Sequence, residues 1–156
     1  VAENVFLGHQ KSQKWYGVDW KGTKARAKEV LDRLGCDVDV EAIVSDLAPG
    51  DAQMVEIARA ICTETKVLIL DEPTSGLDPN QIIKIRQLIK SLGETHTVLL
   101  STHILPEVSA VCSKVVIVNR GRVVMESELS KLSRDKSLEQ IFLESVSQED
   151  AVDAAA

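Results

Sequence analysis

Residues 67–73 read Val-Leu-Ile-Leu-Asp-Glu-Pro, four apolar residues that run directly into two acids and a proline. A short continuous apolar run of this kind is typical of a strand buried on both faces, as in a parallel sheet. A second run, Val98-Leu99-Leu100, leads into Ser101-Thr102-His103. An amphipathic pattern separates the two runs. Strands that alternate with helices predict an α/β fold that binds ligands at the carboxyl ends of its strands.

The rest of the chain carries helix and turn signals. Asp78-Pro79 is an N-cap acid followed by proline at the first helical position, and it predicts a helix that ends near Gly93. Ser137 and Gln140 form the capping-box pattern of a last helix, which we expect to run through Leu143. We also predict helices over 24–35, 50–63 and 106–112, a loop over 8–23 that packs through Trp15, Tyr16 and Trp20, and a hairpin that joins 115–118 to 122–125.

Composition limits the class of protein. The chain has 156 residues, of which 44% are hydrophobic and 27% charged, so it can bury one ordinary core. A net charge of −6 and an aromatic fraction of 3% argue against a nucleic-acid partner, because binding to phosphate backbones needs a basic surface. No apolar stretch approaches the roughly 18 residues that a bilayer crossing needs, so we expect neither a membrane span nor a signal peptide. The three cysteines form no C-x-x-C pair, which predicts reduced thiols in a cytosolic protein.

Polar side chains gather where the two predicted strands end. Asp71 and Glu72 are adjacent and are expected to point in different directions, so one carboxylate can hold a cation while the other polarises a water molecule. His103, at the end of the neighbouring strand, could contact a phosphate or the same water. Magnesium with a positioned water is an arrangement that cleaves a nucleotide γ-phosphate. Each part alone has a plainer interpretation, since a solvated strand end can carry two acids and His103 can be structural.

Four segments in a fixed order make a stronger pattern than any one of them. Residues 47–53 (Leu-Ala-Pro-Gly-Asp-Ala-Gln) precede a helix, 67–72 follow it, 75–78 (Ser-Gly-Leu-Asp) come next, and 101–103 close the set. This order and spacing resemble the ATP-binding subunits of ABC transporters over residues 1–145. The resemblance implies a partial P-loop NTPase (ABC ATPase) fold, with a mostly parallel sheet flanked by helices and an α-helical signature subdomain. The parts implied are a helical signature subdomain over 1–63, the C-terminal part of the α/β ATPase core with a terminal helix over 64–145, and a flexible tail over 146–156.

The resemblance also implies roles for individual residues. Asp71 resembles the Walker B ligand of magnesium, Glu72 the residue that activates the attacking water, and His103 the switch histidine that senses the γ-phosphate. Residues 47–53 resemble the signature loop, whose glycine lets backbone N–H groups approach a phosphate on the opposite subunit. Residues 75–78 resemble the D-loop at the dimer interface. The nucleotide-binding residues implied in this way are Leu47, Ala48, Pro49, Gly50, Asp51 and Asp78.

Membership of this family would imply a subunit that couples hydrolysis of ATP, with Mg²⁺, to solute transport. Its partners would be a transmembrane permease and a second ATP-binding subunit in a homo- or heterodimer, with no nucleic acid. It would be cytoplasmic and peripheral on the cytoplasmic face of the cell membrane. A non-hydrolysing docking or regulatory module is the alternative, and an ABC-type ATPase of ribosomes or DNA fits the acidic charge less well. Residues 2–8 and 53–58 look like sugar importers, whereas 101–108 and 138–143 look like exporters, so substrate and direction stay open.

The chain departs from the family pattern in two ways. Ala48, Pro49 and Asp51 replace the usual Ser, first Gly and Gln of the signature, so a hydroxyl donor is lost and a carboxylate that repels a γ-phosphate is added. No G-x-x-x-x-G-K-[ST] phosphate loop occurs, and the chain opens at Val1 rather than Met. We expect the C-terminal portion of a nucleotide-binding domain, with a natural relative that lacks the P-loop as the alternative. The strand that ends at Asp71 would then have an unpaired edge, which predicts poor stability and aggregation of the chain alone.

Overall fold

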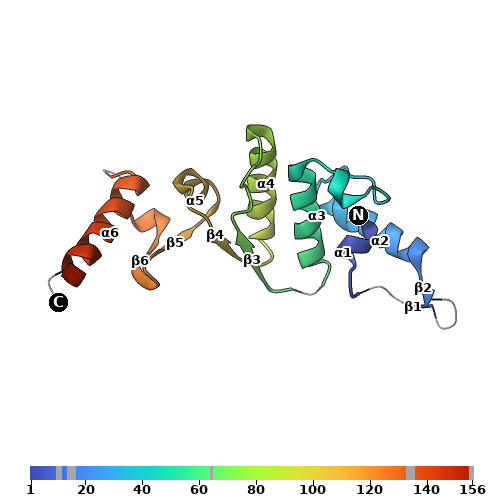
Figure 1. Cartoon of the computed structure of the whole chain (residues 1–156), viewed down its shortest axis with the longest axis horizontal. Coiled ribbons are helices and arrows are strands. Elements are labelled where there is room, and N and C mark those ends of the chain that lie inside the picture. Colours follow the sequence, from blue (N-terminus) through green and yellow to red (C-terminus); the bar gives the residue numbers. More distant parts are fainter. Residues whose placement is uncertain (10–11, 14–16, 64, 133–135, 155–156) are drawn as a thin grey trace. The chain divides into compact units, whose positions relative to one another are not determined.

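The computed structural model describes residues 1–9, 12–13, 17–63, 65–132 and 136–154. It divides into two compact units, Val1–Ser101 and Thr102–Ala156, whose helices and strands are labelled in Figure 1. The division falls after Ser101, and the predicted subdomain boundary between residues 63 and 64 lies inside the first unit, where it stays a prediction. Within the described ranges, no helix combines the length and the apolar character that a membrane crossing requires.

Helices form most of the first unit ahead of its parallel strands. The first three α-helices pack on one another through buried side chains such as Val5, Leu31 and Ile57. Gly35, the last residue of the predicted helix over 24–35, has a φ of +65°, a left-handed conformation in which glycine commonly ends a helix. In chain order the elements are α1 (Ala2–Val5), the antiparallel strands β1 (Ser12–Gln13) and β2 (Gly17–Val18), α2 (Trp20–Arg33), the short 3-10 helix η1 (Val44–Asp46) and α3 (Pro49–Ile61).

Helix α2 begins at Trp20 rather than at Lys24. The reason is Asp19, whose carboxylate accepts a hydrogen bond from the Gly22 N–H at 3.0 Å and caps the helix there. The loop prediction over 8–23 was therefore wrong for the residues of this first turn and for the two short strands before it. Trp20 is 46% exposed and not a buried anchor. Trp15 and Tyr16, the other predicted anchors, lie outside the described residues.

A parallel pair of strands completes the first unit. Strand β3 (Val67–Asp71) pairs with β4 (Thr97–Ser101), and Asp71 lies opposite Ser101 in the register. Helix α4 (Pro79–Leu92) connects the two strands and packs on β4. Both predicted strands and the helix between them are thus confirmed. Within the described residues, β3 and β4 are the only parallel pair, because the other strands form antiparallel pairs.

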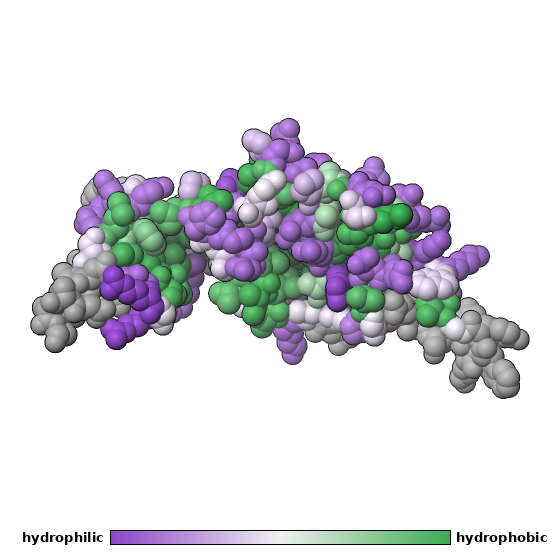
Figure 2. All heavy atoms as spheres, in the orientation of Figure 1, coloured by the Kyte–Doolittle hydropathy of each residue, from purple (hydrophilic) through white to green (hydrophobic). Residues whose placement is uncertain are grey.

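Only one face of this two-stranded sheet is covered by the described residues. Leu68 and Leu70 on β3 are buried, whereas Val67 and Ile69 on the other face are 55% and 70% exposed. Leu99, opposite Ile69 on β4, is 57% exposed, and Figure 2 shows apolar side chains gathered over these strands. The prediction of burial on both faces was therefore wrong for this chain, since no described element covers the second face.

A β-hairpin with a small apolar core forms the second unit. Arg120 and Gly121, with φ of +48° and +81°, make the two-residue turn of the predicted hairpin, as a type I′ turn requires. The core consists of buried residues of the hairpin and α5, against which side chains of α6 such as Phe142 pack. The elements are α5 (Leu105–Val111), β5 (Lys114–Asn119), β6 (Arg122–Glu128), the 3-10 helix η2 (Leu129–Lys131) and α6 (Leu138–Ala154).

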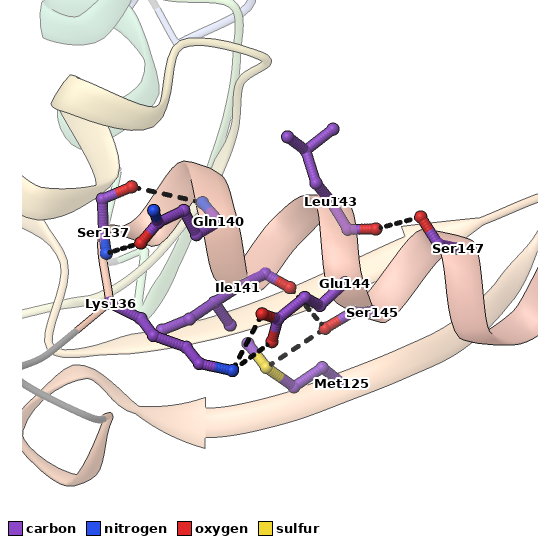
Figure 3. A network of polar contacts seen from close by, with 9 residues as sticks. All are labelled: Met125, Lys136, Ser137, Gln140, Ile141, Leu143, Glu144, Ser145 and Ser147. Carbon is purple, nitrogen blue, oxygen red and sulfur yellow. Dashed lines mark hydrogen bonds and ion pairs between the residues drawn. The ribbon is translucent and has the colours of Figure 1, made fainter.

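The last helix starts as the sequence predicts but ends much later. Gln140 N–H donates to Ser137 Oγ at 3.2 Å and Ser137 N–H donates to Gln140 Oε1 at 3.0 Å, which confirms the capping box (Figure 3). Lys136 Nζ pairs with both carboxylate oxygens of Glu144 at 2.8 and 2.6 Å across the first turns. The helix then continues past the predicted end at Leu143 to Ala154, through the segment predicted as a tail, because no glycine or proline interrupts it.

The cysteines confirm the predicted free thiols. Cys36, Cys62 and Cys112 form no disulfide. Burial raises the pKa of the Cys36 thiol to about 11, and burial also raises the pKa values of the Cys62 and Cys112 thiols. A raised pKa favours the protonated thiol, which is the less nucleophilic form.

Candidate functional site

The two predicted acids of the site lie where β3 ends. Asp71 is the last residue of β3 and lies opposite Ser101, the last residue of β4. One residue further along, the Glu72 N–H donates a hydrogen bond to the Ser101 carbonyl at 2.9 Å. The pairing between the strands thus extends to Glu72 and holds the backbone of both acids against the end of β4.

The backbone of Glu72 is left-handed, with a φ of +46°. Residues with a side chain rarely adopt this conformation, and a residue before proline, here Pro73, prefers an extended one. Such strain costs roughly 1–3 kcal/mol and is concentrated at functional sites, where the surrounding structure maintains it. Here Pro73 is fully buried, Thr74 is 4% exposed, and the Ser75 N–H donates to the Glu72 carbonyl at 3.0 Å. The chain therefore turns at Glu72, and the two acids are not successive residues of one extended strand.

Asp71, the first of these acids, has the position expected of a magnesium ligand. Asp71 is exposed, whereas Glu72 is half-buried. In phosphate-transfer sites Mg²⁺ is bound through one or two carboxylates together with substrate phosphates and water. An exposed carboxylate at a strand end fits this set of oxygen ligands. Over the part of the chain that the structure describes, no three His, Cys, Asp or Glu side chains lie together as a metal site.

The predicted signature loop leads directly into α3. Leu47 is half-buried, Ala48 is the N-cap, and Pro49 occupies the first helical position, where its missing N–H is not needed. Ala48 makes no side-chain capping hydrogen bond. Asp51 lies in the first turn, where its carboxylate is favourable to the helix dipole but brings negative charge to the predicted phosphate position. Gly50 is buried.

Gly50 connects this loop to the start of α4. A Cβ atom at Gly50 would lie 2.8 Å from both Cγ and Cδ of Gln81, so the close approach requires glycine. Gln81 also belongs to a capping box, in which the Asp78 carboxylate accepts from the N–H groups of Asn80 at 2.8 Å and Gln81 at 3.0 Å. Gln81 Oε1 accepts in return from the Asp78 N–H at 3.3 Å. Through Gln81 the structure brings together Gly50 and Asp78, both predicted to bind nucleotide.

His103 lies in the second unit, exposed and just before α5. The predicted acids Asp71 and Glu72 lie in the first unit. The meeting of these three side chains at one triphosphate therefore stays a prediction. The same holds for the contact of the signature residues with a nucleotide.

Two residues beside the predicted site were missed in the sequence. Gln81 could have been found, because an N-cap acid followed by Gln three residues later is a capping-box pattern. Glu107 is 1% exposed and accepts a hydrogen bond from the Thr102 hydroxyl at 3.0 Å, next to His103. A single Glu in a short helix is usually solvated, so its burial has no sequence signal.

Known proteins resemble this chain in sequence. The family model for ABC transporters matches residues 1–75. Ribose import ATP-binding protein RbsA of Caldanaerobacter subterraneus subsp. tengcongensis is 32% identical over 136 residues, which are 86% of this chain and 27% of that protein. The protein of the same name from Rhodococcus jostii is 33% identical over 136 residues, again 86% of this chain and 27% of its own length. The chain thus spans about a quarter of the length of these curated relatives.

Solved structures resemble it in fold. A nucleotide-free ATP-binding cassette from an ABC transporter superposes with a TM-score of 0.69 at 22% identity, over 81% of this chain and 54% of that one. For cbiO1 from Clostridium perfringens, part of the ABC transporter complex cbiONQ, the TM-score is 0.64 at 29% identity, over 80% of this chain and 49% of the other. These likenesses define the class, an α/β domain with the P-loop NTPase fold of ABC ATPases. The sequence matches show that the chain belongs to the ABC transporter family.

Proposed function

We propose that the whole protein hydrolyses ATP and couples the reaction to movement of a solute across a membrane. The observation that carries this proposal is the acid pair at the end of β3, where Glu72 is left-handed and hydrogen-bonded through its N–H to Ser101. In this proposal the subunit is peripheral on the cytoplasmic face of the membrane, bound to a permease and to a second ATP-binding subunit. The names of the ribose import relatives favour import of a small solute such as a sugar.

Each predicted residue has a distinct task in this mechanism. Mg²⁺, when bound, supplies positive charge that offsets the charge of the phosphates, and Asp71 offers it a carboxylate. Glu72 accepts a hydrogen bond from the attacking water and orients it toward the γ-phosphate. His103 donates to an oxygen of the same phosphate. The backbone N–H groups at the start of α3, that of Gly50 among them, bind a phosphate held by the second subunit.

The signature residues favour a second candidate, a docking module that does not hydrolyse ATP. Ala48 offers no hydroxyl at the N-cap of α3, and Asp51 adds a carboxylate to the first turn. Both changes weaken the attraction of this helix start for a phosphate. A docking module would still bind the permease, but ATP would have little effect on that binding.

Replacement of Glu72 by Gln in the intact protein, assembled with its permease, tests the first candidate. The amide keeps the size of the side chain but is a poor base, so we expect ATP turnover to fall by about 100-fold or more. The affinity for ATP, measured by titration with a fluorescent analogue, is expected to stay unchanged. Glu94, an exposed residue of the same unit, provides the matched control. Glu94→Gln should leave turnover as in the wild type.

The same measurements separate the two candidates. Wild-type turnover that survives Glu72→Gln excludes this carboxylate as the group that activates water. A wild-type protein that binds the permease but neither binds nor hydrolyses ATP supports the docking module instead.

A further inference from the structure

A buried carboxylate lies close to His103 in the second unit. Glu107 on α5 is 1% exposed. A carboxylate withdrawn from water to this extent is costly unless it accepts hydrogen bonds. The Thr102 hydroxyl donates one of them, at 3.0 Å to Glu107 Oε2. One partner of this buried group is therefore the residue immediately before His103.

Three hydrogen bonds enclose the backbone of His103. Besides the bond from Thr102 to Glu107, the Ile104 N–H donates to Thr102 Oγ1 at 3.1 Å. The Glu107 N–H donates to the Ile104 carbonyl at 2.9 Å, which closes the ring. Thr102 is thus bonded to the buried Glu107 side chain, and Ile104 is bonded to the Thr102 hydroxyl and to the Glu107 backbone. We call Thr102, Ile104 and Glu107 the histidine lock.

The histidine lock differs from an ordinary helix cap. In a capping box the Glu at the third helical position accepts directly from the N-cap N–H. Here Glu107 is at that position and Ile104 is the N-cap, but the Thr102 hydroxyl stands between them and relays the bond. A direct cap would leave the residue before His103 free to rotate. The two hydrogen bonds of the Thr102 hydroxyl hold this residue in place, just ahead of a helix of only seven residues.

We propose that Thr102 and Glu107 are positioning residues that set the direction of His103 toward the γ-phosphate of ATP. This inference rests on the proposed function, in which His103 contacts that phosphate. Loss of the lock keeps the imidazole group of His103 but lets the backbone that carries it turn, which moves the ring. A misplacement of about 1 Å at a reacting group can lower a rate by about 100-fold without weakening the binding of substrate.

Substitutions at Thr102 test the lock in the intact, permease-bound protein. Thr102→Val keeps the shape of the side chain and removes both hydrogen bonds, whereas Thr102→Ser restores the hydroxyl. We expect Thr102→Val to lower kcat for ATP at least about tenfold with KM unchanged, and Thr102→Ser to keep most of the activity. Glu107→Gln, whose Oε1 can still accept, should resemble Thr102→Ser. Ser109→Ala, an exposed hydroxyl on the same helix, is the control and should change nothing.

A second measurement does not depend on ATP turnover. In the isotopically labelled protein, hydrogen exchange of the Ile104 amide should be faster in Thr102→Val than in the wild type and slow again in Thr102→Ser. If the wild type has no ATP turnover, the proposed function fails, whereas amide exchange still reports on the lock. A Thr102→Val protein with the kcat of Thr102→Ser overturns the positioning role. Equal Ile104 exchange in the two variants overturns the lock itself.

Discussion

Gly50 in the first turn of α3 is a residue at which a single added methyl group should destabilise the first unit. In Gly50→Ala, the new Cβ would lie 2.8 Å from Cγ and Cδ of Gln81 and 3.1 Å from its Cβ. The first two distances are well inside van der Waals contact, so the Gln81 side chain must leave its position. Its Oε1 would then lose the hydrogen bond from the Asp78 N–H, which measures 3.3 Å.

The magnitude follows from two opposing effects. Insertion of a methyl group into packed surroundings costs about 1–3 kcal/mol. Replacement of glycine by alanine in a helix contributes about 0.5–1 kcal/mol in the opposite direction. The difference, about 0–2.5 kcal/mol, is the expected fall in the free energy of unfolding in Gly50→Ala, with about 1 kcal/mol at its centre. In a Gln81→Ala background the two closest contacts are absent and only the contact with Cβ at 3.1 Å remains. The same substitution should then raise the free energy of unfolding by up to about 1 kcal/mol, because the helix gain of alanine is no longer offset.

Urea unfolding followed by circular dichroism, applied to the wild type, both single variants and the double variant, measures this coupling. A double-mutant cycle removes the separate costs of each substitution, and we expect an interaction energy of about 1 kcal/mol between the two positions. Gly50→Ala that stabilises the protein equally in both backgrounds would refute the contact between α3 and Gln81.

Three further predictions concern a cap, a surface and an ion pair. Asp78→Ala should lower the free energy of unfolding by about 1 kcal/mol and Asp78→Asn by less, because Asn also caps a helix; urea midpoints measure both. Ile69→Lys should reduce self-association of the isolated chain in sedimentation experiments, because Ile69 is 70% exposed on the uncovered sheet face. Ile43→Lys, at a residue 66% exposed elsewhere, should not. The hydrogen bond with Lys114 lowers the pKa of Glu126, and the bond with Glu126 raises the pKa of Lys114. The small stabilisation by this exposed pair should therefore be present at neutral pH. It should vanish in acid as Glu126 is protonated, in alkali as Lys114 is deprotonated, and in high salt as the charges are screened. Urea midpoints of the wild type and of Glu126→Gln, compared at each condition, measure this stabilisation.

Elements with a local chemical signal could be predicted from the sequence. Asp78 and Ser137 predict the starts of α4 and α6, because each capping side chain accepts from an N–H only three residues further along the chain. The turn at Arg120 and Gly121 is likewise fixed by neighbouring residues. The start of α2 at Trp20 was missed although Asp19 caps it, because the apolar spacing becomes regular only from Ala27 onward.

Features that depend on distant parts of the chain were harder to predict. The apolar run of β3 gave the strand correctly but not the exposure of Ile69, since that depends on which elements cover each face. For the candidate site, the placement of Asp71 and Glu72 at the end of a strand could be predicted, because they follow the apolar run directly. The contact of Gly50 with Gln81 could not, since it joins two helices whose packing no local pattern encodes.

At Glu72, whose backbone is left-handed, the stability of the fold and the proposed activity favour different residues. Glycine accepts a positive φ without penalty, so Glu72→Gly would release part of the conformational strain while it deletes the carboxylate. The expected product is a more stable protein that lacks the proposed catalytic carboxylate. Selection for heat resistance alone would thus favour the replacement that selection for the proposed ATP turnover removes.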